Sequence, residues 1–170
     1  MSAHPHHTIP PLVPPANCFT VLVVDDMLPN RLLLGKFLRH AGYAVIEASN
    51  GIEALDLLLK EQAHPDLIVT DVEMPVMDGV AFVEQVRCLD NGFETLPIIT
   101  ASGNPTEEMS REAHLAGTTL FLTKPFDLKA LGKSIAKLLR ESRRSSISST
   151  DETATPSNRL GSTIDSEVQL

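Results

Sequence analysis

The chain has 170 residues, of which 42% are hydrophobic, and this is enough for one globular domain with tails. A formal net charge of −8 disfavours broad binding to nucleic acid or to anionic membranes, because both require a basic footprint. No apolar run approaches the roughly 20 residues that cross a bilayer, and the N-terminus lacks the pattern of a signal peptide. Cys18 and Cys88 have neither disulfide-framework nor metal-site spacing. We therefore expect a cytoplasmic protein that binds neither nucleic acid nor membrane.

The two ends of the chain differ in composition from the middle. Residues 1–17 hold five of the twelve prolines and no Asp, Glu, Lys or Arg, which is typical of a disordered leader. Residues 141–170 are rich in Ser and Thr and poor in large apolar residues. Such a segment buries too little surface to offset its ordering entropy, so we expect a disordered tail. The folded domain is therefore expected over residues 18–140.

The first half of this domain alternates apolar runs with segments of helical periodicity. A strand is expected over residues 19–24, a helix over residues 31–39 with Pro29 at its entrance, and a second strand over residues 43–48. The segment from Asn50 to Glu53 has the pattern of a capping box, with the cap residue first and the glutamate three residues later. A second helix is therefore expected from this point to about Gln62.

The second half continues the alternation and completes the sheet. Further strands are expected over residues 67–70, 96–101 and 118–122, with helices from Asp78-Gly79 to about Leu89, from Asn104 onward with Pro105 in the first helical position, and from Asp127 to Arg140. The middle strands are nearly continuous apolar runs, as in a sheet covered on both faces. Right-handed crossovers then predict an α/β fold with a doubly wound, five-stranded parallel sheet of strand order 2-1-3-4-5.

Charged residues follow three of the expected strands. Asp25 and Asp26 follow the first strand, Asp71 ends the third, and Lys124 follows the fifth. Because ligands bind at the carboxyl ends of parallel strands, we expect these side chains in one crevice. Three carboxylates repel one another unless a cation lies between them. Alone, Asp25 and Asp26 could equally cap a helix or line a turn, but their coincidence with Asp71 and Lys124 favours a metal site.

The expected cation is Mg²⁺, which prefers carboxylate, water and phosphate oxygens. We expect Asp26 and Asp71 to be direct ligands, Asp25 to act through a water, and the backbone carbonyl of Glu73 to complete the set. Asp71 is also the expected nucleophile, because a carboxylate can take a phosphoryl group as an acyl phosphate. Lys124 would supply a positive charge to that group, and a cis bond to the proline after it would aim the ammonium into the crevice.

A hydroxyl at the end of the fourth strand has the right position to contact a phosphate. Thr100 can donate to a phosphate oxygen, and Ala101 after it leaves room for the group. Thr70 is different, because its side chain should point away from that of Asp71. We interpret Thr70 as a residue of high strand propensity.

These residues together carry a family resemblance. The set Asp25-Asp26, Asp71, Thr100 and Lys124-Pro125 resembles the receiver domain of two-component response regulators of the chemotaxis-regulator type. The segment DVEMPVMDG from Asp71 to Gly79 closely matches the phosphorylation loop of that family. The resemblance covers roughly residues 19–140 and implies a flavodoxin-like (βα)5 fold.

The resemblance also implies a mechanism and partners. A histidine kinase or histidine phosphotransfer protein would donate a phosphoryl group to Asp71 in the presence of Mg²⁺. The chain would not be an enzyme beyond catalysing its own phosphorylation and slow self-dephosphorylation. Thr100 would then move toward the phosphate and Phe121 would rotate inward behind it, which alters a protein-binding face. Glu73 and Ser102 match the positions that flank the path of the attacking water, so they would tune the lifetime of the acyl phosphate.

Nothing after Arg140 resembles an output domain, so we expect a downstream protein effector that acts in trans. Three alternatives remain at this point. The chain could be a receiver-like binding module that works without phosphate, or a receiver excised from a hybrid histidine kinase. It could also be a phosphohydrolase that forms an aspartyl phosphate. Such enzymes carry a DxD motif after the first strand, however, and here two adjacent aspartates follow that strand.

Overall fold

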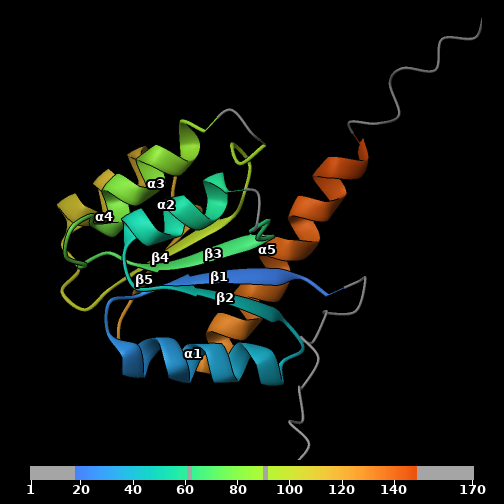
Figure 1. Cartoon of the computed structure of the whole chain (residues 1–170), viewed down its shortest axis with the longest axis horizontal. Coiled ribbons are helices and arrows are strands. Elements are labelled where there is room, and N and C mark those ends of the chain that lie inside the picture. The colour runs from blue at the N-terminus through green and yellow to red at the C-terminus, as the bar shows by residue number, and fades with distance from the viewer. Residues whose placement is uncertain (1–17, 61–62, 90–91, 149–170) are drawn as a thin grey trace, which may run out of the picture.

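The computed structural model describes residues 18–60, 63–89 and 92–148 (Figure 1). Within these ranges five strands and five helices alternate along the chain. Their bounds are β1 Thr20–Val24, α1 Leu28–His40, β2 Ala44–Ala48, α2 Gly51–Leu59, β3 Leu67–Asp71, α3 Gly79–Arg87, β4 Ile98–Ser102, α4 Glu107–Leu115, β5 Leu120–Thr123 and α5 Leu128–Ser148. No helix among the described residues is long and apolar enough to span a membrane.

The strands form one parallel sheet in the order β2-β1-β3-β4-β5, so the predicted fold class and strand order are confirmed. β1 and β3 lie side by side, with Val24 opposite Thr70. β3 and β4 pair so that Asp71 lies opposite Ala101. This register brings the carboxyl ends of β1, β3 and β4 to the same edge of the sheet, where a doubly wound fold binds its ligands.

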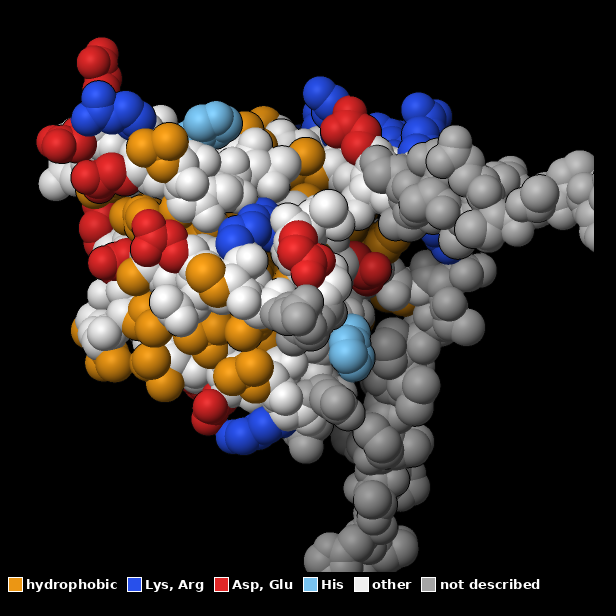
Figure 2. All heavy atoms as spheres, turned by 90° about the horizontal axis from the view of Figure 1, so that it is seen from above, with side chains coloured by type: hydrophobic (Ala, Val, Ile, Leu, Met, Phe, Trp, Pro, Cys, Tyr) orange, Lys and Arg blue, Asp and Glu red, His pale blue; other side chains and the backbone are white. Residues whose placement is uncertain are grey.

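Two apolar cores cover the two faces of the sheet. α1 and α5 lie against one face, and α2, α3 and α4 lie against the other (Figure 1); Figure 2 views the second face from above. Because side chains alternate along a strand, Val21 and Val23 enter the first core while Leu22 and Val24 enter the second. Each fully buried aliphatic side chain contributes about 1.5–3 kcal/mol to folding. The two cores therefore hold the strand ends, and the site at those ends, in place.

The ends of α2 differ in detail from the sequence prediction. Asn50 caps the helix as expected, since its side chain accepts a hydrogen bond of 2.9 Å from the backbone N–H of Glu53. The carboxylate of Glu53, however, accepts from the backbone and the hydroxyl of Ser49, at 2.8 and 2.5 Å, and not from Asn50. The helix ends at Leu59, before the expected end near residue 62. The cap is therefore only half of a capping box.

The start of α4 and the length of α5 are further corrections. The residue that caps α4 is Thr106, whose hydroxyl accepts from the backbone N–H of Met109 at 3.0 Å, so Pro105 lies before the cap and not in the first helical position. Asp127 precedes α5 and accepts from two backbone N–H groups of its first turn, as expected for a cap. The helix passes the expected end near residue 140 and reaches Ser148.

The extra turns of α5 reach the start of the sheet. The guanidinium of Arg143 lies 5.4 Å from the centre of the Phe19 ring, which is a cation–π distance. Residues 141–148 belong to the segment expected to be a disordered tail, and they are helical. The leader at residues 1–17 and the rest of the tail lie outside the described residues.

Candidate functional site

Three carboxylates converge at the edge of the sheet, as the sequence predicts. Asp25, Asp26 and Asp71 each offer one oxygen atom, and these atoms lie within 4.8 Å of one another. Asp25 and Asp71 are only 7% exposed, whereas Asp26 faces solvent. Two of the three negative charges are thus taken out of water, where repulsion between them is poorly screened. The cluster is a set of hard oxygen ligands that a divalent cation would neutralise.

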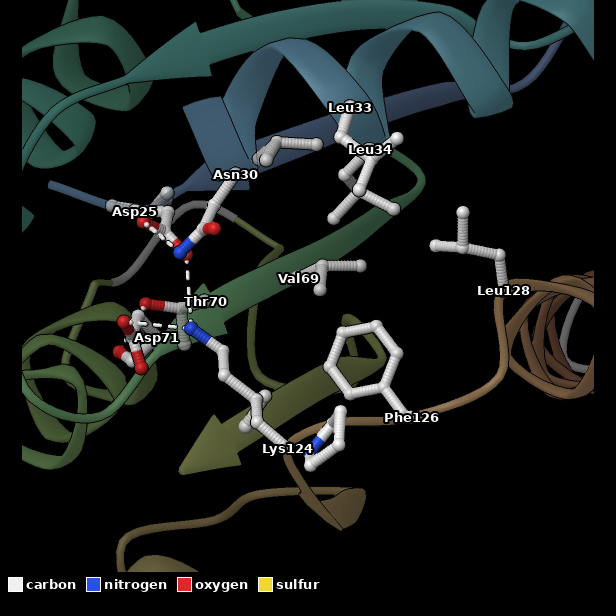
Figure 3. Close-up of a pocket in the computed structure, with 14 residues that line it drawn as sticks. Asp25, Asn30, Leu33, Leu34, Val69, Thr70, Asp71, Lys124, Phe126 and Leu128 are labelled. Atoms are coloured by element: carbon white, nitrogen blue, oxygen red, sulfur yellow. Dashed lines mark hydrogen bonds and ion pairs between the residues drawn. The ribbon is translucent and has the colours of Figure 1, made fainter. Parts of the chain in front are cut away.

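Lys124 extends into this cluster from the end of β5. Its Nζ atom lies 3.0 Å from Asp25 Oδ2 and 2.8 Å from Asp71 Oδ2 (Figure 3). The Lys124–Pro125 peptide bond is cis, as expected. Burial lowers the pKa of the ammonium, but its hydrogen bonds to the two carboxylates outweigh that effect and raise the pKa. Lys124 is therefore held in its charged form between the two aspartates.

The carboxylate of Asp71 is in a less favourable environment. Burial raises its pKa, and the hydrogen bond and charge of Lys124 only partly offset this. Its Oδ2 atom contacts Lys124, but its Oδ1 atom has no hydrogen-bond partner among the described residues. A buried acceptor without a partner costs about 1–3 kcal/mol. Asp71 therefore has an oxygen that lacks, and would gain from, a further electrophilic partner.

Asp25 is fixed by groups that the sequence analysis did not identify. Its carboxylate accepts from the backbone N–H of Met27 at 2.9 Å and from the side-chain amide of Asn30 at 3.2 Å. Arg31 donates to the backbone carbonyls of Asp25, at 2.6 Å, and of Asp26, at 3.2 Å. The signal available in the sequence was the position of Asn30 and Arg31 in the first turn of the helix that follows the aspartates.

The hydroxyl of Thr100 is fully buried and its Oγ1 atom has no hydrogen-bond partner among the described residues. Thr70 differs, because its hydroxyl donates to the backbone carbonyl of Asp71 at 3.0 Å. The two threonines lie opposite each other across the β3–β4 pair, and Thr70, not Thr100, lines the cavity beside Asp71. They differ in that the Thr70 hydroxyl has a backbone partner, whereas the Thr100 hydroxyl has none within the described part of the chain. The expected contact between Thr100 and a phosphate oxygen stays a prediction.

Phe121 is the neighbour of Thr100 in the sheet, and the two residues lie opposite each other across the β4–β5 pair. Leu120 and Leu122 pack into the core of the α1 and α5 face. Because side chains alternate, Phe121 lies on the other face, where it is half-buried. The ring is therefore neither locked in the core nor fully in solvent.

The loop that follows Asp71 makes a tight return into α3. The backbone N–H of Gly79 donates to the carbonyl of Val72 at 2.9 Å, and a Cβ atom at Gly79 would collide with the carbonyl oxygen of Asp71, so only glycine fits. Val76 has a φ angle of 70°, and the backbone N–H of Met77 closes a turn onto the carbonyl of Pro75 at 2.8 Å. This backbone region is costly for a β-branched residue.

Glu73 and Ser102 join two loops beside the acidic cluster. The hydroxyl of Ser102 donates to Glu73 Oε1 at 2.8 Å, and the backbone N–H of Gly103 donates to Oε2 at 3.3 Å. Ser102 is fully buried and also accepts from the backbone N–H of Asn104 at 3.0 Å. The loop after β3 is thus tied to the loop after β4, a contact that sequence spacing did not predict.

A cavity of about 250 Å³ opens beside the paired aspartates and Lys124. Its polar end is formed by Asp25, Asn30, Asp71 and Lys124, as Figure 3 shows. Its apolar end is formed by side chains from α1, β3 and the start of α5, which are Leu33, Leu34, Val69, Phe126 and Leu128. The site is therefore a crevice with charges at one end, where a small anion and a cation could be held together.

Comparisons with known proteins agree with this geometry. The family model of the response regulator receiver domain matches residues 21–136. Sporulation initiation phosphotransferase F of Bacillus subtilis is 33% identical over 119 residues, which are 70% of this chain and 92% of that protein. The sensor histidine kinase CheAY of Helicobacter pylori is 36% identical over 108 residues, which are 64% of this chain but only 13% of the kinase.

Solved structures give the same result. The chemotaxis response regulator CheY4 of Vibrio cholerae superposes with a TM-score of 0.64 at 35% identity, over 71% of this chain and 98% of that one. A receiver protein from Pseudomonas putida superposes with a TM-score of 0.66 at 32% identity, over 72% and 99%. With the family match over most of the folded part and the predicted strand order in place, the chain belongs to the response regulator receiver domain family.

Proposed function

We propose that this chain accepts a phosphoryl group on Asp71 from the phosphohistidine of a histidine kinase or a histidine phosphotransfer protein. The observation that carries the proposal is the convergence of Asp25, Asp26 and Asp71 on Lys124 while one oxygen of Asp71 remains without a partner. Such a carboxylate is poised to form a bond to phosphorus. The relatives include a protein that the match covers to 92% and a kinase that it covers to only 13%.

The residues present fit a Mg²⁺ ion. The three carboxylates have one paired cation, Lys124, among the described residues, so the cluster keeps an excess of negative charge. Asp26 and Asp71 would be direct ligands, Asp25 would act through a water, and the backbone carbonyl of Glu73 would add an oxygen. When bound, the ion neutralises charge on the transferring group and on the carboxylates.

The transfer itself is a substitution at phosphorus. An Asp71 oxygen forms the new O–P bond while the P–N bond of the phosphohistidine breaks, and the electron pair returns to the imidazole, which takes up a proton from water. Lys124 stays protonated and pairs with a phosphate oxygen, since its hydrogen bonds already favour the charged form. No further protein group has to gain or lose a proton, so the chain's contribution is position and charge.

Phosphorylation would change the protein through Thr100 and Phe121. The unpartnered hydroxyl of Thr100 gains a phosphate oxygen as acceptor, and its movement leaves space for the half-buried ring of Phe121. A hydrogen bond to a charged group contributes roughly 1.5–3 kcal/mol, and moving a population from 1:99 to 99:1 requires about 5.5 kcal/mol. Two such bonds, from Thr100 and Lys124, could therefore drive the switch and present an altered face to a protein effector in trans.

The lifetime of the acyl phosphate would depend on Glu73 and Ser102. Their hydrogen bond of 2.8 Å holds the loops after β3 and β4 together beside Asp71. The attacking water must pass these loops, so we expect the contact to affect hydrolysis. The charge of Glu73 is also directed toward Ser102 and Gly103.

The donor protein would have an apolar surface to contact. Met27, Leu28, Leu32 and Leu33 of α1 and its cap are all more than half exposed, and Leu33 also lines the cavity at the site. A phosphohistidine can reach Asp71 only if the protein that carries it covers this region. Exposed apolar side chains suit such a contact. We accordingly propose a cytoplasmic signalling role, where histidine kinases present their phosphohistidine.

The test is phosphorylation of the full chain by acetyl phosphate and by phosphorylated histidine phosphotransfer proteins, followed by intact-mass and peptide mapping. We expect one added phosphoryl group, on Asp71, that is lost in Asp71→Asn and after removal of Mg²⁺ with a chelator. Asp56→Asn is the matched control, because Asp56 is an exposed carboxylate on α2. Modification that survives Asp71→Asn would overturn the proposal.

The alternatives give different results in the same assay. A binding module that works without phosphate would show no modification with any donor and no response to beryllofluoride with Mg²⁺. A phosphohydrolase would release phosphate from added esters in many turnovers. Transfer profiling against purified kinases would then name the donor.

A further inference from the structure

A second concave surface, distinct from the cavity beside Lys124, lies between α3 and α4 and the loop that follows β3. This groove has a volume of about 770 Å³ and opens to solvent. Its lining includes four acidic residues, Glu73, Asp78, Glu84 and Glu112. Figure 2 shows acidic side chains gathered toward the left edge of the face formed by α2, α3 and α4, with hydrophobic side chains among them. No Lys, Arg or His lines the groove among the described residues.

The acidic residues of the groove fall into two pairs. Asp78 caps α3 through the backbone N–H of Ala81, and Glu73 accepts from Ser102 and Gly103, so these two carboxylates already serve the fold. Glu84 on α3 and Glu112 on α4 form no side-chain hydrogen bond or ion pair within the described part of the chain. They face one groove from opposite walls. The side chains of Glu84 and Glu112 therefore do not stabilise the described part of the fold through hydrogen bonds or ion pairs.

The floor of the groove is apolar and adaptable. Met74 and Met109 line it, the first buried and the second half-buried. Methionine is flexible and polarisable, and it is frequent at surfaces that accommodate varied apolar side chains. A segment that fits this groove must therefore offer an apolar side chain to the thioethers and cationic side chains to the two walls.

We propose that the groove between α3 and α4 binds a cationic amphipathic segment of another protein, with Lys or Arg side chains at Glu84 and Glu112 and an apolar side chain over Met109. Charge complementarity selects this occupant, since an acidic or neutral segment would leave both carboxylates unpaired. One end of the groove is formed by Val72, Glu73 and Met74, which directly follow Asp71, but the two carboxylates that would pair with the segment, Glu84 and Glu112, belong to α3 and α4. Binding to them does not require a phosphoryl group on Asp71.

The experiment measures binding of a fluorescent Leu/Lys peptide to the full chain by anisotropy, with no phosphodonor present. The peptide is a helix of about four turns with leucines on one face, and the buffer contains about 0.15 M salt, where the Debye length is about 8 Å and distant charges are screened. We expect Glu84→Gln/Glu112→Gln to weaken binding about tenfold, as two ion pairs of ordinary strength would. Met109→Ala should weaken it further.

The matched control is Asp56→Asn/Glu94→Gln, which has the same net charge but changes exposed residues outside α3, α4 and the groove. It should leave the affinity within about twofold of the unchanged protein, because screened charges at a distance contribute little. Amide shifts in NMR spectra should appear on α3 and α4. Equal loss in the two double variants, equal binding of a scrambled peptide of the same composition, or shifts confined to α1 would overturn the proposal. None of these results bears on whether Asp71 is phosphorylated.

Discussion

Two regions of the site differ in whether their buried polar atoms have hydrogen-bond partners. One region follows β1 and β2, and the other follows β3 and β4. After β1 the buried carboxylate of Asp25 has hydrogen bonds from Met27, Asn30 and Lys124. At the ends of β3 and β4, Asp71 Oδ1 and Thr100 Oγ1 are buried without partners. Val76, in the loop after β3, also adopts a costly backbone conformation. The buried carboxylate after β1 has all of its contacts made, whereas two buried oxygens at the ends of β3 and β4 have none within the described part of the chain.

This difference distinguishes residues that hold the structure of the site from residues that respond to a ligand. A carboxylate with all of its contacts made is a fixed part of the frame, and it gains little from a ligand. Groups that lack partners raise the free energy of the unliganded state and recover it when a ligand arrives. We therefore interpret Asp25 as the fixed member of the cluster and the ends of β3 and β4 as the part that changes, and the following predictions test this interpretation.

The largest expected effect is that of Asp25→Ala. The change removes the acceptor of Met27, Asn30 and Lys124, although Lys124 keeps Asp71 as its partner. Losing hydrogen bonds to a charged group costs about 2–3 kcal/mol. The free energy of unfolding, measured with urea in the absence of divalent cations, should fall by that amount. Asp66→Ala, which removes a carboxylate that accepts one bond from the backbone of Thr20, should cost less. An equal loss in both variants would contradict the special position of Asp25.

Thr100→Val should raise the free energy of unfolding, whereas Asp25→Ala lowers it. The substitution keeps the shape of the side chain and removes a buried hydroxyl that has no partner, so we expect the unphosphorylated protein to gain about 1–2 kcal/mol in urea unfolding. The comparison is Ser102→Ala, which removes a buried hydroxyl that bonds Glu73 and should destabilise by about 1 kcal/mol. The interpretation fails if both substitutions destabilise.

Asp71→Asn should also stabilise the protein when no Mg²⁺ is present. Burial raises the pKa of this carboxyl group, so the folded state disfavours the charge, and a neutral isostere removes that penalty. We expect a gain of about 1 kcal/mol, a usual size for single substitutions. The measurement is urea unfolding with a chelator, and a clear loss of stability would show that the Asp71–Lys124 pair outweighs burial.

Val76→Gly tests the strain in the loop after β3. A Cβ atom at positive φ costs roughly 1–2 kcal/mol, while glycine loses somewhat more backbone entropy on folding. Because Val76 is 84% exposed and buries little, we expect a net gain of about 0.5–1 kcal/mol in thermal or urea unfolding. Val76→Ala keeps the Cβ atom and should gain much less. A loss in the glycine variant would indicate that the side chain makes a contact that outweighs the strain.

The smallest effect concerns Glu53, in the region that follows β1 and β2. Hydrogen bonds from the Ser49 side chain and backbone lower the pKa of this carboxyl group below its ordinary value of 4.5. A lowered folded-state pKa contributes stability above 4.5 that is lost as the pH falls through the folded value. Glu53→Gln should therefore cost about 0.5 kcal/mol at neutral pH, a small figure because the group is exposed to solvent.

The same pair of proteins should be compared in acid. Well below the lowered pKa, both proteins carry a neutral side chain at position 53, so their urea midpoints should coincide. A difference that persists unchanged in acid would mean that the glutamine variant is destabilised for reasons other than the lost charge.

Local sequence signals predicted the frame of the molecule well. Strand propensity, turn residues and strict alternation led to the five strands in their observed order, and the residues directly after them led to the convergence of Asp25, Asp26 and Asp71. These inferences succeed because strand ends and their side-chain direction follow from a period of two and from the handedness of crossovers. The predicted start of α4, at Asn104 with Pro105 in the first helical position, was wrong by two residues, because Asn and Thr both cap helices and the cap is Thr106.

Contacts between distant segments were beyond such reasoning. The bond from Ser102 to Glu73 joins residues 29 apart, and the groove between α3 and α4 exists only when both helices are in place. The same holds for Arg143 over Phe19, which accompanies the longer α5. Spacing along the chain cannot give these distances, because they depend on how helices pack on the sheet.

By itself, then, the sequence determined which elements form, their order in the sheet and which charged residues meet at its edge, because local periodicity and topology leave few alternatives. Only the tertiary structure decided which of those residues have hydrogen-bond partners for their polar atoms and which do not. A hydrogen bond requires a distance of about 3 Å between donor and acceptor atoms. When these atoms belong to separate loops, the packing of the elements sets that distance. For this protein that distinction separates Asp25, which is held by its neighbours, from Asp71 and Thr100, which retain unpartnered oxygens.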